Sequence, residues 1–122
     1  MSHERYKELE VWKEAYKLAL RVYKITEQFP MEERFGLVQQ LRRASVAVFT
    51  NLAEGHARGS RRDYAHFCVI ARGSQAEVLS LLSFSRDLRL VGDTVWQELD
   101  DAYARVGRML NGLVTSLRRE ST

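Results

Sequence analysis

The sequence predicts an all-α protein, an antiparallel up-down-up-down bundle of four helices. Only one proline and seven glycines occur among 122 residues, so few positions interrupt a helix. Apolar residues recur every three or four positions along the chain, and no stretch alternates in the manner of a strand. We therefore expect one domain over residues 1–122, with helices at about 9–28, 37–54, 61–90 and 95–118.

The first two predicted helices each end at a residue that interrupts helical geometry. Pro30 ends the first, because the residue before a proline is displaced from helical conformation. Gly55 should end the second in the left-handed conformation. The first helix carries two adjacent apolar rows, from Leu9 to Tyr23 and from Val11 to Phe29, which is wider than one core contact needs. This width suggests a second contact with a neighbouring subunit.

The last two predicted helices begin at capping boxes. Ser60 and Asp63 have the spacing that starts the third helix at Arg61, and Thr94 and Gln97 have the spacing that opens the fourth. Gly92 should end the third helix. We expect the core row of the third helix to contain Tyr64, Phe67, Ala71, Ser74, Val78, Leu81 and Leu88. Another face carries small residues, which would let a further helix approach closely: Val69, Gly73, Ala76, Ser80 and Ser83.

Composition limits the partners and the compartment. The net charge of +3 mildly favours acidic partners, and fifteen of the nineteen basic residues are arginines, whose planar forks suit carboxylates and phosphates. The single cysteine, Cys68, excludes an internal disulfide. Because the first residues lack an apolar signal region and no apolar run approaches membrane-spanning length, we expect a cytoplasmic protein.

Two basic clusters are candidate nucleic-acid contacts. One is the loop before the third helix, with Arg58, Arg61 and Arg62, which could bind an anion together with the backbone N–H groups of a helix start. The other is a stripe on the first helix, at spacings of four, four and three: Lys13, Lys17, Arg21 and Lys24. The alternatives are a solvated basic loop, arginines that reach acids on a neighbouring subunit, and a solvated helix face.

A set of polar residues is expected to fix helix register as an ion-pair and amide network: Arg43, Asn51, Glu54, Arg72, Ser74 and Glu77. Glu77 lies beside the predicted core row of its helix, so we expect it to be partly buried with an arginine partner on another helix. The alternative is a ligand or catalytic pocket.

Patterns that would indicate an enzyme are missing. His3, His56 and His66 lack the spacing of metal ligands, no nucleophile elbow surrounds Ser60 or Ser74, and no phosphate-loop motif follows the glycines. We expect no catalytic, metal or cofactor site. Aromatic residues at helical spacing are expected in the core rather than as base-stacking platforms: Trp12, Tyr16, Tyr23, Tyr64 and Trp96.

Several short motifs at defined separations are specific enough to compare with a known family. They are Phe29-Pro30, Gly36-Leu37, Gln39 to Ala44, Asn51 to Gly55, Arg58, Ser60, Ala71 to Ser74 and Glu77. In these the chain resembles the bacterial four-helix-bundle family named after proteins encoded in intervening sequences of 23S ribosomal RNA genes. The resemblance implies a homopentamer without known catalysis. It also implies kinship with the accessory variability protein of diversity-generating retroelements, a pentamer that binds nucleic acid and a reverse transcriptase.

These observations together predict a non-catalytic homo-oligomer, a pentamer by resemblance, that binds RNA or DNA mainly through phosphate contacts. A rival interpretation is a protein–protein adaptor or scaffold for a partner enzyme such as a reverse transcriptase. A third is an enzyme whose activity depends on Glu77.

Overall fold

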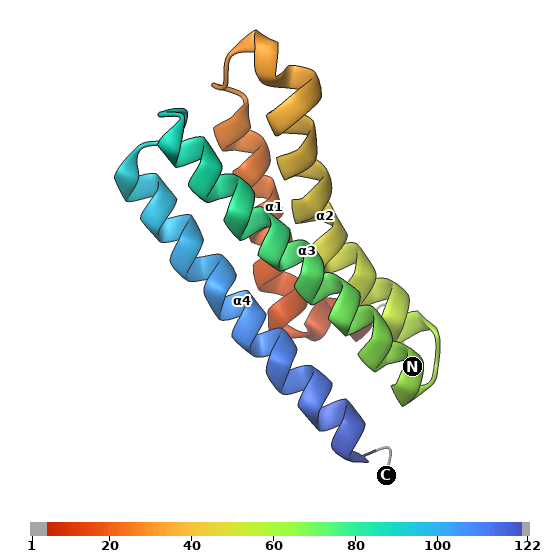
Figure 1. The fold of residues 1–122 in the computed structure, drawn as a ribbon. Helices are drawn as coiled ribbons and strands as arrows, with labels where there is room; N and C mark the ends of the chain where they lie inside the picture. Colours follow the sequence, from red (N-terminus) through yellow and green to blue (C-terminus); the bar gives the residue numbers. More distant parts are fainter. Residues whose placement is uncertain (1–4, 121–122) are drawn as a thin grey trace.

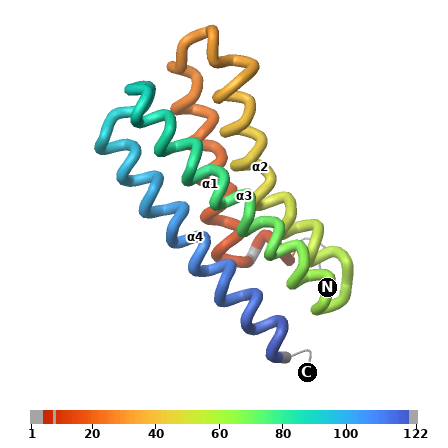
Figure 2. The backbone as a smooth tube through the Cα atoms, viewed as in Figure 1, coloured from red at the N-terminus to blue at the C-terminus, as the bar shows by residue number. Residues whose placement is uncertain are grey.

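The computed structural model describes residues 5–120, which form four long antiparallel helices (Figure 1). These are α1 (Glu10–Thr26), α2 (Gln39–Ala57), α3 (Arg61–Asp87) and α4 (Asp93–Glu120). α3 packs against both α2 and α4, and α1 lies diagonally across from α3 between the same two helices (Figure 2). The predicted all-α four-helix bundle is confirmed.

Short helical turns complete the described chain. A 3-10 turn, η1 (Arg5–Glu8), precedes α1, and a second, η2 (Met31–Glu33), follows Pro30. A π-helical turn, η3 (Arg34–Val38), then leads directly into α2. α1 ends at Thr26, two residues before the expected boundary, and its last turns are held by a side chain of α2, as described below.

The core fills the space between the four helices with leucines and valines. Its largest fully buried side chains come from α2, α3 and α4: Leu41, Leu52, Leu82, Leu99, Leu110 and Tyr103. α1 contributes Val11, Ala15, Leu18 and Val22, the second of its two predicted apolar rows. Part of the first row stays at the surface, where Tyr16 and Tyr23 are exposed.

Two predicted helix ends are wrong, one for a packing reason and one for a backbone reason. Gly55 does not end α2, because it lies inside the helix where a Cβ would sit 2.7 Å from the Cβ of Phe67. α2 continues to Ala57, and the left-handed residue is Gly59, with a φ of 85°. α3 ends at Asp87 and Arg89 is left-handed, so Gly92 is not its stop.

The two predicted capping boxes had different outcomes. The Ser60 Oγ accepts a hydrogen bond from the backbone N–H of Asp63 at 3.1 Å, so the start of α3 is confirmed. α4 instead begins at Asp93, and the backbone N–H of Trp96 donates to the carbonyl oxygen of Gly92. Thr94 therefore lies inside α4 and does not cap it.

The buried face of α3 differs from the predicted one. Ala71 and Val78 are buried as expected, but the other buried positions are Ala65, Cys68, Gln75, Leu82 and Ser85. Leu88, placed in the core by the sequence, is 46% exposed. α3 is packed closely between two helices, so small side chains face inward and several large ones lie at the rim. Of the expected strip of small residues, Gly73, Ala76 and Ser80 are exposed.

α3 is also long and apolar enough to cross a membrane when judged by length and composition alone. Helices in the cores of soluble proteins meet the same criterion, so it is weak evidence for a membrane span. Here α3 packs along its length between α2 and α4 (Figure 1).

Candidate nucleic-acid interface

One end of the bundle gathers the basic loop and the end of the chain. α2 ends there, α3 begins there, and the antiparallel course of α4 returns its last turn to the same end (Figure 1). The Ser60 cap fixes the start of α3, so Arg61 and Arg62 occupy the first turn of a 27-residue helix. Arg118 lies in the last turn of α4.

Arg61, Arg62 and Arg118 line one cavity of about 450 Å³, which we call the basic cavity. Its remaining lining comes from α3: Ala65, His66 and Val69. Arg61 and Arg118 already make contacts within the chain, so an incoming anion would share these side chains with their present partners. The structure thus brings together two predicted arginines and a third from a helix that the sequence analysis did not connect to them.

Arg58, the third arginine of the predicted loop cluster, does not line the basic cavity. Its Nε donates to the Glu54 carboxylate at 3.0 Å, and its guanidinium lies 4.8 Å from the ring centroid of Phe67. Both Arg58 and Glu54 are about half exposed, so this i,i+4 pair adds only about 0.3–0.5 kcal/mol. The interactions hold Arg58 against the outer surface of α2 and α3.

A second cavity, of about 300 Å³, lies next to the basic cavity at the same end of the bundle. It is lined by His56, Gly59, Ser60, Arg61, Tyr64 and Leu117, and we call it the aromatic cavity. The His56 and Tyr64 rings meet edge to face, with centroids 5.6 Å apart and planes at 83°. Arg61 lines both cavities.

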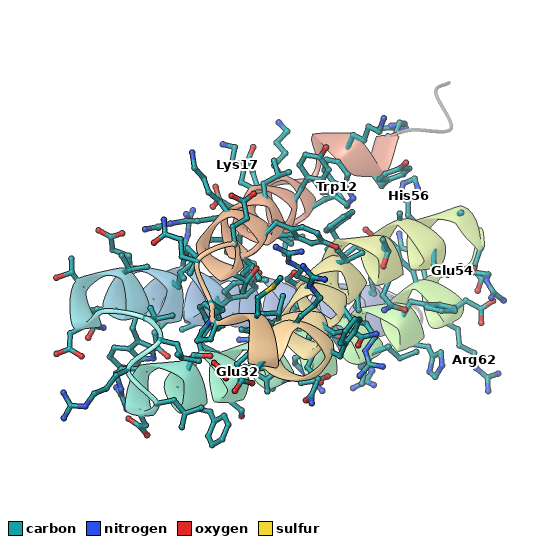
Figure 3. The ribbon with its side chains drawn as sticks, turned by 90° about the horizontal axis from the view of Figure 1, so that it is seen from above. Trp12, Lys17, Glu32, Glu54, His56 and Arg62 are labelled. Atoms are coloured by element: carbon teal, nitrogen blue, oxygen red, sulfur yellow. The ribbon has the colours of Figure 1, made fainter. Side chains whose placement is uncertain are left out.

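The predicted basic stripe lies on a different side of the bundle. Lys13 pairs with Glu10 at 3.5 Å, and Arg21 forms an ion pair with Glu98 of α4. Lys17 and Lys24 are exposed. Because α1 and α3 are diagonal to one another, Lys17 points away from the side that carries Arg62 (Figure 3). The structure therefore does not bring the stripe and the loop arginines together.

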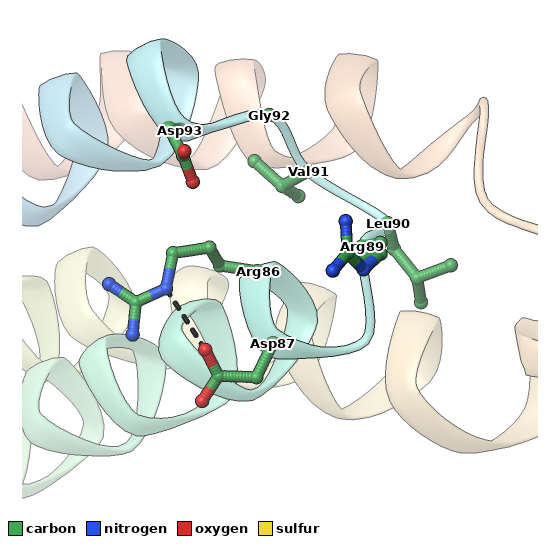
Figure 4. A pocket seen from close by; sticks show the side chains of 7 residues that line it. All are labelled: Arg86, Asp87, Arg89, Leu90, Val91, Gly92 and Asp93. Carbon is green, nitrogen blue, oxygen red and sulfur yellow. Dashed lines mark hydrogen bonds and ion pairs between the residues drawn. The ribbon is translucent and has the colours of Figure 1, made fainter.

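A further cavity, of about 470 Å³, opens at the other end of the bundle, where α3 turns into α4 (Figure 4). It is lined by two arginines, Arg86 and Arg89, and by two carboxylates, Asp87 and Asp93. Arg86 donates to Asp87 at 3.1 Å and covers the Trp96 ring at 3.9 Å from its centroid. Since the charges balance and Arg86 is engaged, this cavity is a weaker anion site than the basic cavity.

A model of the 23S rRNA-intervening sequence protein family matches residues 7–112. The chain belongs to this family. No curated protein matches the chain. A solved structure from Bacteroides thetaiotaomicron, a protein of unknown function from the S23 ribosomal protein family, has a TM-score of 0.77 and 17% identity over 85% of this chain and 97% of that chain. At that identity, the likeness shows the fold.

The six residues of the predicted polar network are not joined to one another in this family member. The Asn51 amide donates to the Ala47 carbonyl of its own helix at 2.8 Å. Arg72 donates to the Asn111 side chain of α4 at 2.8 Å, so it does tie two helices. Glu54 pairs with Arg58, and no hydrogen bond or ion pair within residues 5–120 links two members of the set. Arg43 and Glu77 are exposed and Ser74 is half-buried.

The expectation that Glu77 is partly buried is wrong. The inward face of α3 runs through Ala71, Gln75 and Val78, which turns Glu77 outward. The buried polar contact is made instead by Gln75, whose Nε2 donates to the Tyr103 carbonyl of α4 at 2.8 Å. The sequence reasoning missed Gln75 because its face of α3 was not expected to be buried.

The structure also shows a clamp that the sequence analysis did not find. Arg42 of α2 donates to the Thr26 Oγ1 at 2.9 Å and to the Tyr23 carbonyl at 3.1 Å, and it covers the Tyr23 ring at 4.5 Å. These groups belong to the last turn of α1, where the carbonyls of a helix lack the regular backbone donors found in its interior. The sequence signal, a threonine near a helix end, does not indicate which arginine reaches it.

The titratable groups in the core are neutral. Burial raises the pKa of the Cys68 thiol to about 12, and burial followed by the nearby Cys68 raises the pKa of Tyr64 to about 12. Burial also raises the pKa of Tyr103. Cys68 is therefore a protonated core residue rather than a nucleophile. Within residues 5–120, no three His, Cys, Asp or Glu side chains gather closely enough to hold a metal ion.

Proposed function

We propose that this protein is a cytoplasmic, non-catalytic homo-oligomer that binds RNA or DNA mainly through phosphate contacts. The observation that carries the proposal is the basic cavity, where three arginines from two helices line one recess. Guanidinium groups bind phosphate oxygens through paired N–H donors, and three of them on one surface suit a phosphate chain better than a single carboxylate.

The charge of its lining distinguishes the basic cavity from the cavity at the other end of the bundle. Among the described residues that line it, none is acidic, whereas the cavity at the α3–α4 turn carries two aspartates. Its floor of Ala65 and Val69 excludes water on one side, which strengthens charge interactions there. A recess of about 450 Å³ with three arginines and an apolar floor supports an anionic ligand that is larger than a single ion.

Self-association is supported by apolar side chains that the bundle leaves at its surface. α1 exposes Tyr16, Leu20 and Tyr23 along one stripe, with Leu20 at 59%. The diagonal helix α3 exposes Ile70 and Phe84, and Leu88 directly after its end is exposed as well. Two different apolar faces on opposite sides of one subunit suit a head-to-tail contact, which closes into a ring when the rotation permits. Light scattering on the purified protein is expected to give a closed oligomer, and a monomer at micromolar concentration would refute this part of the proposal.

Nucleic-acid binding is tested by titrating labelled single-stranded RNA at two salt concentrations. If three phosphates are neutralised per site, the slope of log affinity against log salt is about −2, so affinity falls about 20-fold between about 50 and 200 mM salt. The double variant Arg61→Glu/Arg62→Glu should lose binding. The matched control is Arg105→Glu/Arg108→Glu, which makes the same charge change at exposed positions in the middle of α4.

The control separates a local site from general charge attraction. Both double variants change the net charge equally, so a difference between them reports the basic cavity itself. Equal losses in the two variants, or no binding to RNA or DNA at low salt, would contradict the proposal.

A second candidate function is an adaptor that holds a partner protein. It is favoured by Met31 and Phe35, which are 75% and 83% exposed in the turns before α2. The variant Met31→Ser/Phe35→Ser should abolish capture of that partner from the native host while leaving RNA binding unchanged. Capture that is unaffected by this variant would remove the support for the adaptor function.

A further inference from the structure

We propose that the aromatic cavity binds one unstacked base of a single-stranded nucleic acid, while neighbouring phosphates of the same strand lie in the basic cavity. This inference rests on the proposed function and specifies its ligand as a single strand rather than a duplex. The observation behind it is that an aromatic recess and a basic recess share one side chain, Arg61.

The walls of the aromatic cavity suit a flat, uncharged ring. His56 and Tyr64 present two rings at 83° to each other, and Leu117 adds an apolar wall. The His56 ring is also held by Tyr6 of η1, with ring centroids 6.3 Å apart. A ring fixed by two neighbours loses little freedom when a ligand stacks on it, which favours binding.

The size and charge of the aromatic cavity restrict the class of ligand that it can bind. A volume of about 300 Å³ lies at the lower end of small-molecule sites, which fits one ring system rather than a large ligand. Arg61 and the nearby Arg62 disfavour a cationic guest, so an aromatic cation is a poor candidate. A base joined to phosphates satisfies both cavities at once, because its ring is neutral and its backbone is anionic.

The spatial relation of the two cavities supports a single strand. Both lie at the start of α3, one toward the end of α2 and the other along Ala65 and Val69, and His56 and Arg62 are found at the same end of the bundle (Figure 3). Bases in a duplex have their faces covered by their neighbours, so a stacking site is accessible only to a strand whose bases can turn out. Stacking is tolerant of sequence, because every base has a flat face.

The test compares three ligands by fluorescence anisotropy at low salt: a mixed-sequence RNA strand of about 12 nucleotides, the same strand in a duplex, and an abasic DNA strand of equal length. The variant His56→Ala should weaken binding of the RNA strand about tenfold and leave the duplex and abasic strand within about twofold. The variant His56→Phe keeps an aromatic ring and should bind the RNA strand within about twofold of the wild type. Circular dichroism melting shows whether each variant keeps the fold.

The outcomes separate this inference from the proposed function. If the wild type binds duplex as tightly as the single strand, or if His56→Ala binds the RNA strand normally, the base site is refuted while phosphate binding stands. An equal loss for all three ligands in His56→Ala refutes it as well, because the abasic strand has no base to stack. If none of the ligands binds at low salt, both the inference and the proposed function fail.

Discussion

Replacing Gly55 with alanine is expected to destabilise the protein, although alanine is the better helix former. A Cβ at this position would lie 2.7 Å from the Phe67 Cβ and 3.2 Å from the Tyr64 carbonyl oxygen, and neither atom is the end of a flexible side chain. The steric overlap of the alanine Cβ with these atoms is therefore relieved only if α2 and α3 move apart. Overpacking of this kind costs about 1–3 kcal/mol, and the gain in helix propensity offsets about 1 kcal/mol of it.

The expected net loss for Gly55→Ala is therefore about 0–2 kcal/mol. For a chain of this length, the upper end of that range lowers the melting temperature by about 8 °C. The control is Gly73→Ala, because Gly73 is an exposed glycine inside α3 whose added Cβ would meet nothing within 4 Å. This control should raise stability by about 0.5–1 kcal/mol. Thermal melts that show the same stabilisation in both variants would refute the close approach of α2 and α3.

Two further predictions concern the clamp on α1 and the buried neutral groups. Arg42→Ala should lower the free energy of unfolding by about 1–2 kcal/mol in urea titrations, because it removes two hydrogen bonds and a cation–π contact, whereas the exposed Arg43→Ala should change it by less than about 0.5 kcal/mol. Equal effects would count against the clamp. Burial raises the pKa of Cys68 and Tyr103, so the unfolded chain loses these protons first, and stability should be flat below about pH 8 and fall from about pH 9 upward. The Tyr103 hydroxyl has no partner within the described chain, so Tyr103→Phe should be neutral or stabilising and should reduce that alkaline loss; an unchanged alkaline slope in this variant would contradict the assignment.

The four helices could be predicted from the sequence because their signals are local. Apolar spacing requires only knowledge of the helical period, and the Ser60 cap requires only four consecutive residues. The stop at Gly55 was predicted wrongly from an equally local signal. Glycine serves helix ends and close helix contacts alike, and only the position of Phe67 on α3 shows which role applies.

The candidate site was predicted in part. Arg61 and Arg62 were found from their place in a basic loop, and the structure puts both in one cavity. Arg118 could have been added by following the predicted antiparallel topology, which returns the last turn of α4 to the start of α3. His56 and Tyr64 were not expected as cavity walls, because their contact depends on how closely α2 and α3 pack.

Local chemistry in the chain was enough to determine the helix count, the antiparallel order and the basic character of the loop before α3. It could not determine which face of α3 is buried, because a helix with apolar residues on several sides offers more than one inward face. Packing between α2 and α4 decided this, placing Gln75 inside against Tyr103 and turning Glu77 outward. Contacts between residues far apart in the chain depend on such rotations, so the position of Arg61 between two cavities is decided by the packing of α2, α3 and α4.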